Sequence, residues 1–266
     1  MPREFTYGPF KSRRLGLSLG VNILRKHKFC TYNCVYCEIG NTRNEHLVSP
    51  NHIIDIKPQN KFKKELHSIL KHFPHLDSIT FGYNGETTLN KNIDEFVRIA
   101  KDVRESLSWK DEPPNLTLFT NSSTLFMERI RKKIADFDVI LAKLDVGTEE
   151  DFLRTNRPHK NVPKLHKIIN SLGKLKQELK EGHKLVIQIL IYNSYKEDFL
   201  ANNNPSNISA LADALNKIKP SVVQIYSVAR IPAEYFVYSI DNQEKQKIVF
   251  KLKKLIDDNS IKVKYY

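Results

Sequence analysis

The sequence predicts an α/β domain built around a mainly parallel β-sheet. Six short β-rich segments recur along the 266 residues, and segments with the 3.6-residue periodicity of amphipathic helices lie between them. Two of the β-rich segments, 139–142 and 185–191, are almost continuously apolar. Alternating strands and helices predict parallel pairing with helical crossovers, and continuously apolar strands are typical of a sheet covered on both faces.

The elements follow one another without a long linker or a low-complexity segment, so one domain is expected. In chain order, the candidate strands cover residues 15–24, 78–83, 116–120, 139–146, 185–192 and 222–228. Two helices show a clear apolar stripe, one over 62–73 and a longer one over 162–179. Three further helices are expected over 124–134, 206–218 and 244–257.

Periodicity alone does not decide whether this sheet is open and doubly wound or curled into a barrel. Gly16 and Gly20 lie inside the first β-rich segment with no helix after them, so they do not form a dinucleotide-binding turn. In both architectures the loops at the carboxyl ends of the strands carry the functional residues. The loop after the first strand contains all three cysteines, and we expect the functional site there.

Composition and charge narrow the class of protein. No apolar segment approaches the roughly 20 residues that span a bilayer, and the first residues lack the apolar core of a secretory signal. We therefore expect a cytoplasmic protein without a membrane partner. The net charge is +13, and most lysines fit the solvated faces of helices. One local basic group flanks the cysteines and suits an anionic substrate or an acidic electron donor: Lys11, Arg13, Arg14, Arg25, Lys26 and Lys28.

The cysteines have the spacing Cys30-x3-Cys34-x2-Cys37. Thiols packed this closely indicate a metal site rather than a disulfide framework. One candidate is zinc, with His27 or His46 as the fourth ligand. The other is an iron–sulfur cluster in which three cysteines leave one iron without a protein ligand. The single compact loop favours the cluster, because zinc sites usually pair two separated Cys-containing turns.

The cysteine spacing, with Tyr36 before the third cysteine, resembles the radical S-adenosylmethionine (SAM) superfamily. Residues 81–89, Phe-Gly-Tyr-Asn-Gly-Glu-Thr-Thr-Leu, are similar to its glycine-glycine-glutamate motif. Further segments, at 7–21, 144–145, 155–159 and 228–233, resemble a group of short iron–sulfur oxidoreductases related to the wyosine-forming tRNA enzymes. The resemblance implies a six-stranded partial (βα)6 TIM-like barrel as a single domain, with a [4Fe-4S] cluster and SAM at the carboxyl ends of its strands.

The resemblance also implies roles for individual residues. Cys30, Cys34 and Cys37 would bind the cluster, and Tyr36 would lie near the adenine. Asn84, Gly85 and Glu86 match the segment that binds the methionyl amine, although Asn84 and Thr87 depart from the usual glycine and proline. Polar groups at the ends of the next two strands would meet the ribose: Asn121, Ser122, Lys143 and Asp145.

Several of these residues also fit purely structural roles. Arg157 would bind the methionyl carboxylate or form a surface ion pair. Ser122 also suits a helix N-cap, and Asp145 a helix cap or an ion pair. Gln188 is either a core amide or a cofactor contact, and Arg230 is a candidate substrate contact.

The function expected from the resemblance is reductive cleavage of SAM to a 5′-deoxyadenosyl radical, which abstracts hydrogen from an unidentified substrate. The electron donor would be an acidic protein such as flavodoxin or ferredoxin. Two alternatives are tRNA base modification by the same chemistry and a non-catalytic Cys3His zinc module that binds nucleic acid. The expected organisation is a basic segment at 1–14, the core at 15–235, and a helix and short strand at 236–266 packed on the core.

Overall fold

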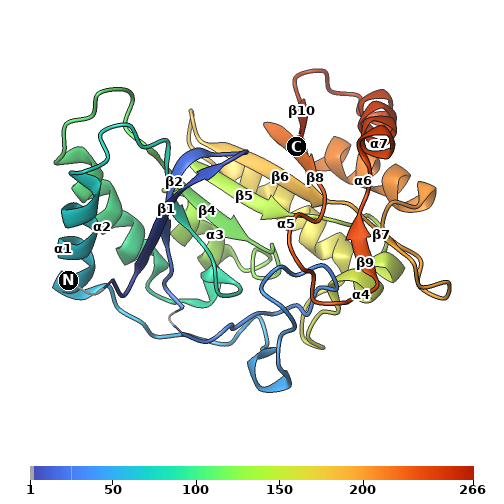
Figure 1. The fold of residues 1–266 in the computed structure, drawn as a ribbon, viewed down its shortest axis with the longest axis horizontal. Helices are drawn as coiled ribbons and strands as arrows, with labels where there is room; N and C mark the ends of the chain where they lie inside the picture. Colours follow the sequence, from blue (N-terminus) through green and yellow to red (C-terminus); the bar gives the residue numbers. More distant parts are fainter. Residues whose placement is uncertain (1–2, 25) are drawn as a thin grey trace.

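In the computed structural model, which describes residues 3–24 and 26–266, the chain forms an eight-stranded sheet with helices between the strands (Figure 1). The strand order is β1-β2-β3-β4-β5-β6-β8-β10. All six predicted strands are present, and they pair in chain order and in parallel, which confirms the expected α/β class. They are β2 (Gly16–Val21), β3 (Ser78–Phe81), β4 (Asn115–Thr120), β5 (Val139–Lys143), β6 (Lys184–Leu190) and β8 (Val222–Tyr226).

The six-strand count was too small. Strand β1 (Thr6–Ser12) pairs antiparallel with β2, and β10 (Lys262–Tyr265) pairs parallel with β8 at the other edge. The register of β1 shifts between Tyr7 and Phe10, which interrupts the alternation that a regular strand shows in sequence. Strand β10 lies where a short C-terminal strand was expected, although most of its residues are exposed. The residues expected to form a basic segment thus supply an edge strand.

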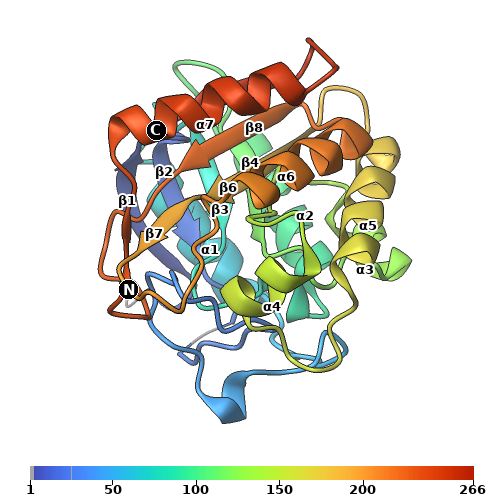
Figure 2. The same ribbon diagram turned by 90° about the vertical axis from the view of Figure 1, so that its right-hand side faces the viewer.

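A second, two-stranded antiparallel sheet joins β7 (Tyr192–Ser194) to β9 (Val237–Ser239). Figure 2 shows the last helices packed beside β6 and β8. The helices of the chain are α1 (Gln59–Leu70), α2 (Ile93–Glu105), α3 (Glu128–Ile134), α4 (Glu149–Asn156), α5 (Leu165–Glu178), α6 (Pro205–Ile218) and α7 (Asn242–Leu255), with short 3-10 turns η1 (Asn44–His46) and η2 (Thr87–Leu89). Within the described residues no helix is both long and apolar enough to cross a membrane.

The helix expectations were right for α1, α5, α6 and α7 and incomplete elsewhere. Helix α3 begins at Glu128 rather than near Thr124, whose hydroxyl instead hydrogen-bonds Thr88. Helices α2 and α4 were not foreseen. Helix α4 has a local signal, because the Thr148 hydroxyl accepts from the backbone N–H of Asp151 as an N-cap.

The two faces of the sheet differ in chemistry, since successive side chains of a strand point to opposite faces. On one face Leu19 and Ile79 are fully buried and belong to the core that the helices cover. On the other face polar side chains pair across strands, as Ser18 does with Thr80 at 2.7 Å between hydroxyl oxygens. Further along the sheet, Lys143 and Gln188 are register partners on this same polar face. The polar side chains of this face continue to the carboxyl ends of the strands.

Candidate metal-cluster and cofactor site

The cysteine loop follows β2 and is attached to the loop that follows β3. The Phe29 N–H donates to the Asn84 carbonyl at 3.2 Å, and the Glu86 N–H donates to the Phe29 carbonyl at 2.8 Å. These bonds make a short parallel bridge between Phe29 and Gly85. The start of the cysteine motif is therefore fixed to the segment that resembles the glycine-glycine-glutamate motif.

A second attachment joins the loop to the end of α4, beside which it lies in Figure 1. The backbone N–H groups of Asn33 and Val35 each donate at 3.0 Å, to the carbonyls of Asn156 and Thr155 respectively. The last carbonyls of a helix have no partner within the helix, so these bonds satisfy them. Arg157 ends α4 in the left-handed conformation, with φ of 44°. The loop thus caps a helix whose final residues lie against the cysteines.

The three thiols are free and half-buried, and each accepts one N–H donor from a different part of the chain. The Nδ2 groups of Asn121 and Asn156 lie 3.4 Å from the sulfurs of Cys30 and Cys34, respectively. The Nζ group of Lys28 lies 3.3 Å from the sulfur of Cys37. The sequence identified Asn121 as a site residue and placed Asn156 in the segment 155–159 that resembles the family, but it gave no indication that Asn156 and Lys28 contact the sulfurs.

Burial sets the protonation of the unligated thiols. It raises the pKa of Cys30 to about 11 and, with Cys37 and Cys30 as negative neighbours, the pKa of Cys34 to about 12. At neutral pH both groups are therefore thiols. Because metals bind the thiolate, ligation here must displace protons.

The donor set fits an iron–sulfur cluster better than a single zinc ion. Four ligands of zinc must lie within about 2.3 Å of one point. No group of three or more Cys, His, Asp or Glu side chains in the described part of the chain converges in this way. His46, a proposed fourth zinc ligand, instead packs its ring on Phe29 at 4.8 Å between centroids. Three thiols on one short loop, each with a side-chain N–H donor, would hold a cubane and leave one of its irons without a protein ligand.

Glu86 is completely buried, and both of its carboxylate oxygens accept from the protein. Its Oε1 accepts from the Thr120 hydroxyl at 2.7 Å and from the Thr88 N–H at 3.2 Å, while its Oε2 accepts from the Asn121 N–H at 2.6 Å. Burial raises its pKa, and these donors offset part of that rise. Glu86 therefore ties the loop after β3 to the end of β4, and its contact with a methionyl amine stays a prediction.

Asp145 forms a buried cluster with three other side chains at the ends of β5 and β8. The Tyr36 hydroxyl donates to Oδ2 of Asp145, and Nζ of Lys143 lies 2.7 Å from Oδ1. Nζ of Lys143 also donates to the Tyr226 hydroxyl at 2.9 Å. The structure thus brings together Tyr36, Lys143 and Asp145, as expected, and adds Tyr226, which the sequence did not single out.

The charges in this cluster are mutually dependent. Burial alone would lower the pKa of Lys143, but the Asp145 carboxylate and Tyr226 hold it above its usual value, so the ammonium stays charged. Burial and the same carboxylate raise the pKa of Tyr36, so its hydroxyl stays a donor. The cluster therefore holds the Lys143–Asp145 ion pair against the aromatic rings of Tyr36 and Tyr226, beside the cysteine loop.

The remaining expected residues have other partners. The Ser122 hydroxyl is buried and donates to the Lys143 carbonyl at 2.8 Å. Arg157 forms an ion pair with Glu234. Gln188 is fully buried and donates to Gln224 at 2.8 Å. Arg230 is 78% exposed and lies 4.0 Å from Glu38, near the end of the cysteine motif. Arg25, part of the expected basic group, lies outside the described residues.

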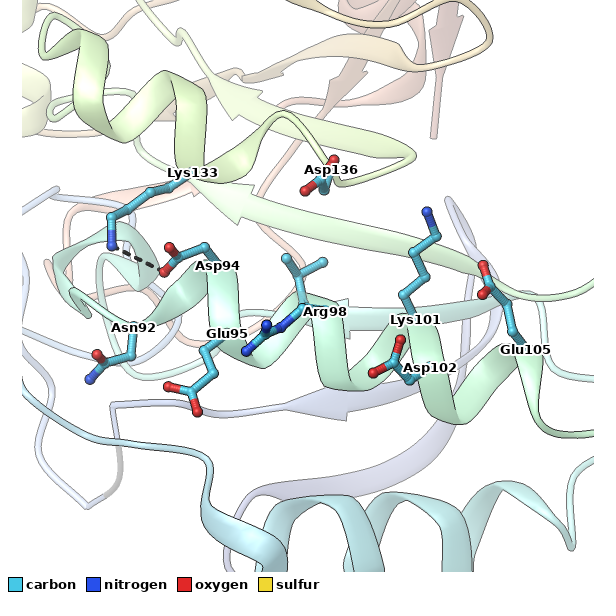
Figure 3. Close-up of a pocket in the computed structure, with 10 residues that line it drawn as sticks. Asn92, Asp94, Glu95, Arg98, Lys101, Asp102, Glu105, Lys133 and Asp136 are labelled. Atoms are coloured by element: carbon cyan, nitrogen blue, oxygen red, sulfur yellow. Dashed lines mark hydrogen bonds and ion pairs between the residues drawn. The ribbon is translucent and has the colours of Figure 1, made fainter.

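A surface groove of about 690 Å³ lies between α2 and α3 and is not part of this site (Figure 3). Its lining is mostly charged side chains on the outward side of α2, and Lys133 reaches across to Asp94 at 3.0 Å. A much smaller enclosed cavity lies among Asn121, Lys143, Asp145 and Asn156. Its volume of about 10 Å³ has room for about one water molecule.

Solved structures of radical SAM enzymes share this fold. SuiB of Streptococcus suis bound to S-adenosylmethionine matches with a TM-score of 0.59 at 13% identity, over 90% of this chain and 48% of SuiB. Native anSMEcpe with bound AdoMet gives a TM-score of 0.60 at 15% identity, over 93% and 63%. TYW1 with a lysine-pyruvate adduct bound gives 0.56 at 14%, over 91% and 73%. The chain thus spans about half the length of SuiB.

No family model matches the chain. In sequence it is 30% identical over 258 residues to UPF0026 protein MJ1312 of Methanocaldococcus jannaschii, which covers 97% of this chain and 74% of the relative. UPF0026 protein slr1464 of Synechocystis sp. is 27% identical over 219 residues, or 82% and 73% of the two chains. The chain therefore belongs to the UPF0026 family, and its fold is that of the radical SAM enzymes.

Proposed function

We propose that this protein is a radical SAM enzyme in which Cys30, Cys34 and Cys37 hold a [4Fe-4S] cluster. The observation that carries the proposal is a set of three half-buried thiols on the one loop that follows β2, each with a side-chain N–H donor. Matching structures with bound SAM support the cofactor assignment. When bound, the reduced cluster supplies the electron that cleaves SAM to methionine and a 5′-deoxyadenosyl radical, which abstracts hydrogen from the substrate.

The residues of this chain position and enclose that chemistry. The bridge between Phe29 and Gly85 fixes the cysteine motif beside the segment expected to bind the methionyl amine. Tyr36, held by Asp145, presents an aromatic face beside the loop. The Lys143 ammonium, paired with Asp145, lies 4.8 Å from the centroid of that ring and places a fixed charge beside it. These residues orient groups and exclude solvent, and none of them needs to change protonation.

The proposal is tested by the product of SAM cleavage. Protein reconstituted anaerobically with iron and sulfide, reduced with dithionite and given SAM should yield 5′-deoxyadenosine, measured by chromatography and mass spectrometry. Cys34→Ala should yield none, because two thiols do not hold the cluster. Asp136→Asn, which changes an exposed residue paired with Lys180, serves as the control and should retain the activity. Native protein that contains zinc and never forms 5′-deoxyadenosine would refute the proposal.

We further propose an anionic substrate, with tRNA as the case to test first. Lys26 and Arg43 are exposed beside the cysteine loop, Arg43 to 79% of its side chain. Binding through such cations should weaken steeply as salt rises, because each phosphate contact releases a counterion. Lys26→Ala and Arg43→Ala should reduce both the affinity for tRNA and the salt slope, while Lys101→Ala on α2 should change neither. Absence of binding, or binding that is insensitive to salt, would remove tRNA as the substrate.

The exposed cations Lys26 and Arg43 also suit an acidic electron donor such as flavodoxin or ferredoxin. Opposite charges speed the encounter of two proteins more than they strengthen the complex. Lys26→Ala and Arg43→Ala are therefore expected to slow reduction of the cluster by flavodoxin at low salt and to leave reduction by dithionite unchanged.

A further inference from the structure

We propose that Lys28, Asn121 and Asn156 form a sulfur-donor set that raises the reduction potential of the cluster. The inference rests on the proposed function, since it concerns the same three cysteines. Each sulfur accepts an N–H donor from one member of the set, at 3.3 to 3.4 Å. Donors to ligand sulfur stabilise the extra negative charge of the reduced state, and protein groups around a cluster tune its potential in this way.

The amide of Asn121 is held so that its nitrogen faces sulfur. Its Oδ1 accepts from the Ser123 N–H at 3.0 Å, and only an oxygen can do so. The other end of the amide, Nδ2, donates at 2.8 Å to the Thr31 hydroxyl and at 3.4 Å to Cys30. The buried carboxylate of Glu86 fixes the backbone of Asn121 as well. This donor is therefore oriented before any cluster binds.

The amide of Asn156 is oriented by a different argument. Its side chain lies 3.3 Å from the Tyr36 hydroxyl, which already donates its proton to Asp145. That hydroxyl can only accept from Asn156, so the nitrogen Nδ2 must face it. The same Nδ2 lies 3.4 Å from Cys34, and the residue is 4% exposed. The cluster of Tyr36 and Asp145 thereby fixes a donor to the second sulfur.

Lys28 is the charged member of the set. Its Nζ group also donates to the Gly40 carbonyl, which closes the loop around Cys37 and keeps the ammonium beside the sulfur. Hydrogen bonds from a charged donor are roughly twice as strong as neutral ones. Its removal should therefore shift the potential more than removal of either amide.

A purely structural role for these residues predicts a different result. Donors that only hold the loop in place would affect how much cluster binds, but not the potential of the cluster that remains. The deciding measurement is a redox titration of the reconstituted protein, followed by electron paramagnetic resonance (EPR), with iron and sulfide content measured for every variant.

Lys28→Met should lower the midpoint potential most, making reduction by a fixed donor at least tenfold less favourable, which is 59 mV for a one-electron couple. Asn121→Leu and Asn156→Leu should each lower the midpoint potential by less, and Lys28→Arg, which keeps a charged donor, should keep the wild-type potential. Lys28→Gln keeps a neutral N–H donor and should fall between the wild type and Lys28→Met. Lys101→Met removes an exposed charge on α2, away from the sulfurs, and serves as the control; it should leave the potential unchanged.

Wild-type potentials in all the loaded variants would overturn this inference alone. A wild-type protein that binds no iron–sulfur cluster would overturn the proposed function together with it. Asn121→Leu tests a neutral donor, and Lys28→Gln tests the charge of Lys28. If Lys28→Met binds no cluster, the potentials of these two variants decide the question.

Discussion

Replacing Gly85 by alanine is expected to detach the cysteine loop from the sheet and to prevent cluster binding. Gly85 has φ of 111°, a conformation that L residues rarely adopt, and an added Cβ would lie 1.8 Å from the Phe29 carbonyl oxygen. That oxygen accepts from the Glu86 N–H, so it cannot move away without breaking the bridge between the loops. Backbone strain and overpacking each cost about 1–3 kcal/mol, so the free energy of unfolding is expected to fall by about 2–6 kcal/mol.

Two other glycines separate the causes of this effect. Gly182 also has a positive φ, of 83°, but an added Cβ meets nothing within 4 Å, so Gly182→Ala should show the cost of strain alone. Gly173 lies in α5, where Cβ meets only the Lys217 carbonyl at 3.8 Å, so Gly173→Ala should stabilise by about 0.5–1 kcal/mol. Chemical denaturation measures the free energy of unfolding of each variant, and iron analysis measures how much cluster it binds. Gly85→Ala with full stability and full iron content would contradict this account of the loop.

Replacing Asp145 by asparagine is expected to destabilise the fold by about 3–5 kcal/mol, the usual cost of removing one partner from a buried ion pair. The side chain of Asp145 is 1% exposed and that of Lys143 is 17% exposed. The substitution leaves the Lys143 ammonium without its counterion, and it keeps only one acceptor oxygen where the Tyr36 hydroxyl and the Leu190 N–H now have one each. Cluster binding should weaken as well, because Tyr36 in turn accepts from the amide of Asn156.

The controls for Asp145→Asn use the same substitution in another setting. Asp136→Asn breaks an ion pair whose side chains are 53% and 61% exposed, and should cost less than about 1 kcal/mol. The double variant Asp145→Asn/Lys143→Met removes both charges and should recover part of the lost stability. Equal denaturation midpoints for the Asp145→Asn and Asp136→Asn variants would show that the buried pair does not stabilise the site.

The fold was largely predictable from the sequence because its strands and helices bury one continuous core. Leu19 and Ile79 occupy the alternating positions that define such strands. The edge strand β1 lacks this signal because it contains a break in register, whereas β10 lies where a short C-terminal strand was expected. Helix α4 is short, and its N-cap at Thr148 was its clearest local signal.

The site was predictable only where its residues are close in sequence. The spacing of the cysteines indicated a cluster, and the ends of β4 and β5 indicated Asn121 and Asp145. Asn156 meets Cys34 across 122 positions of the chain, a contact that no local pattern encodes. Arg157 was expected either to bind a carboxylate ligand or to form an ion pair, and in the structure it pairs with Glu234.

The central claim is that three cysteine thiolates hold a cubane whose fourth iron is available to SAM. The most direct measurement is the EPR spectrum of the reconstituted, dithionite-reduced protein before and after SAM is added. We expect the signal of a reduced [4Fe-4S] cluster whose g values change with SAM, and no such signal from Cys34→Ala. A protein without that signal, or with a signal that SAM leaves unchanged, would contradict the account.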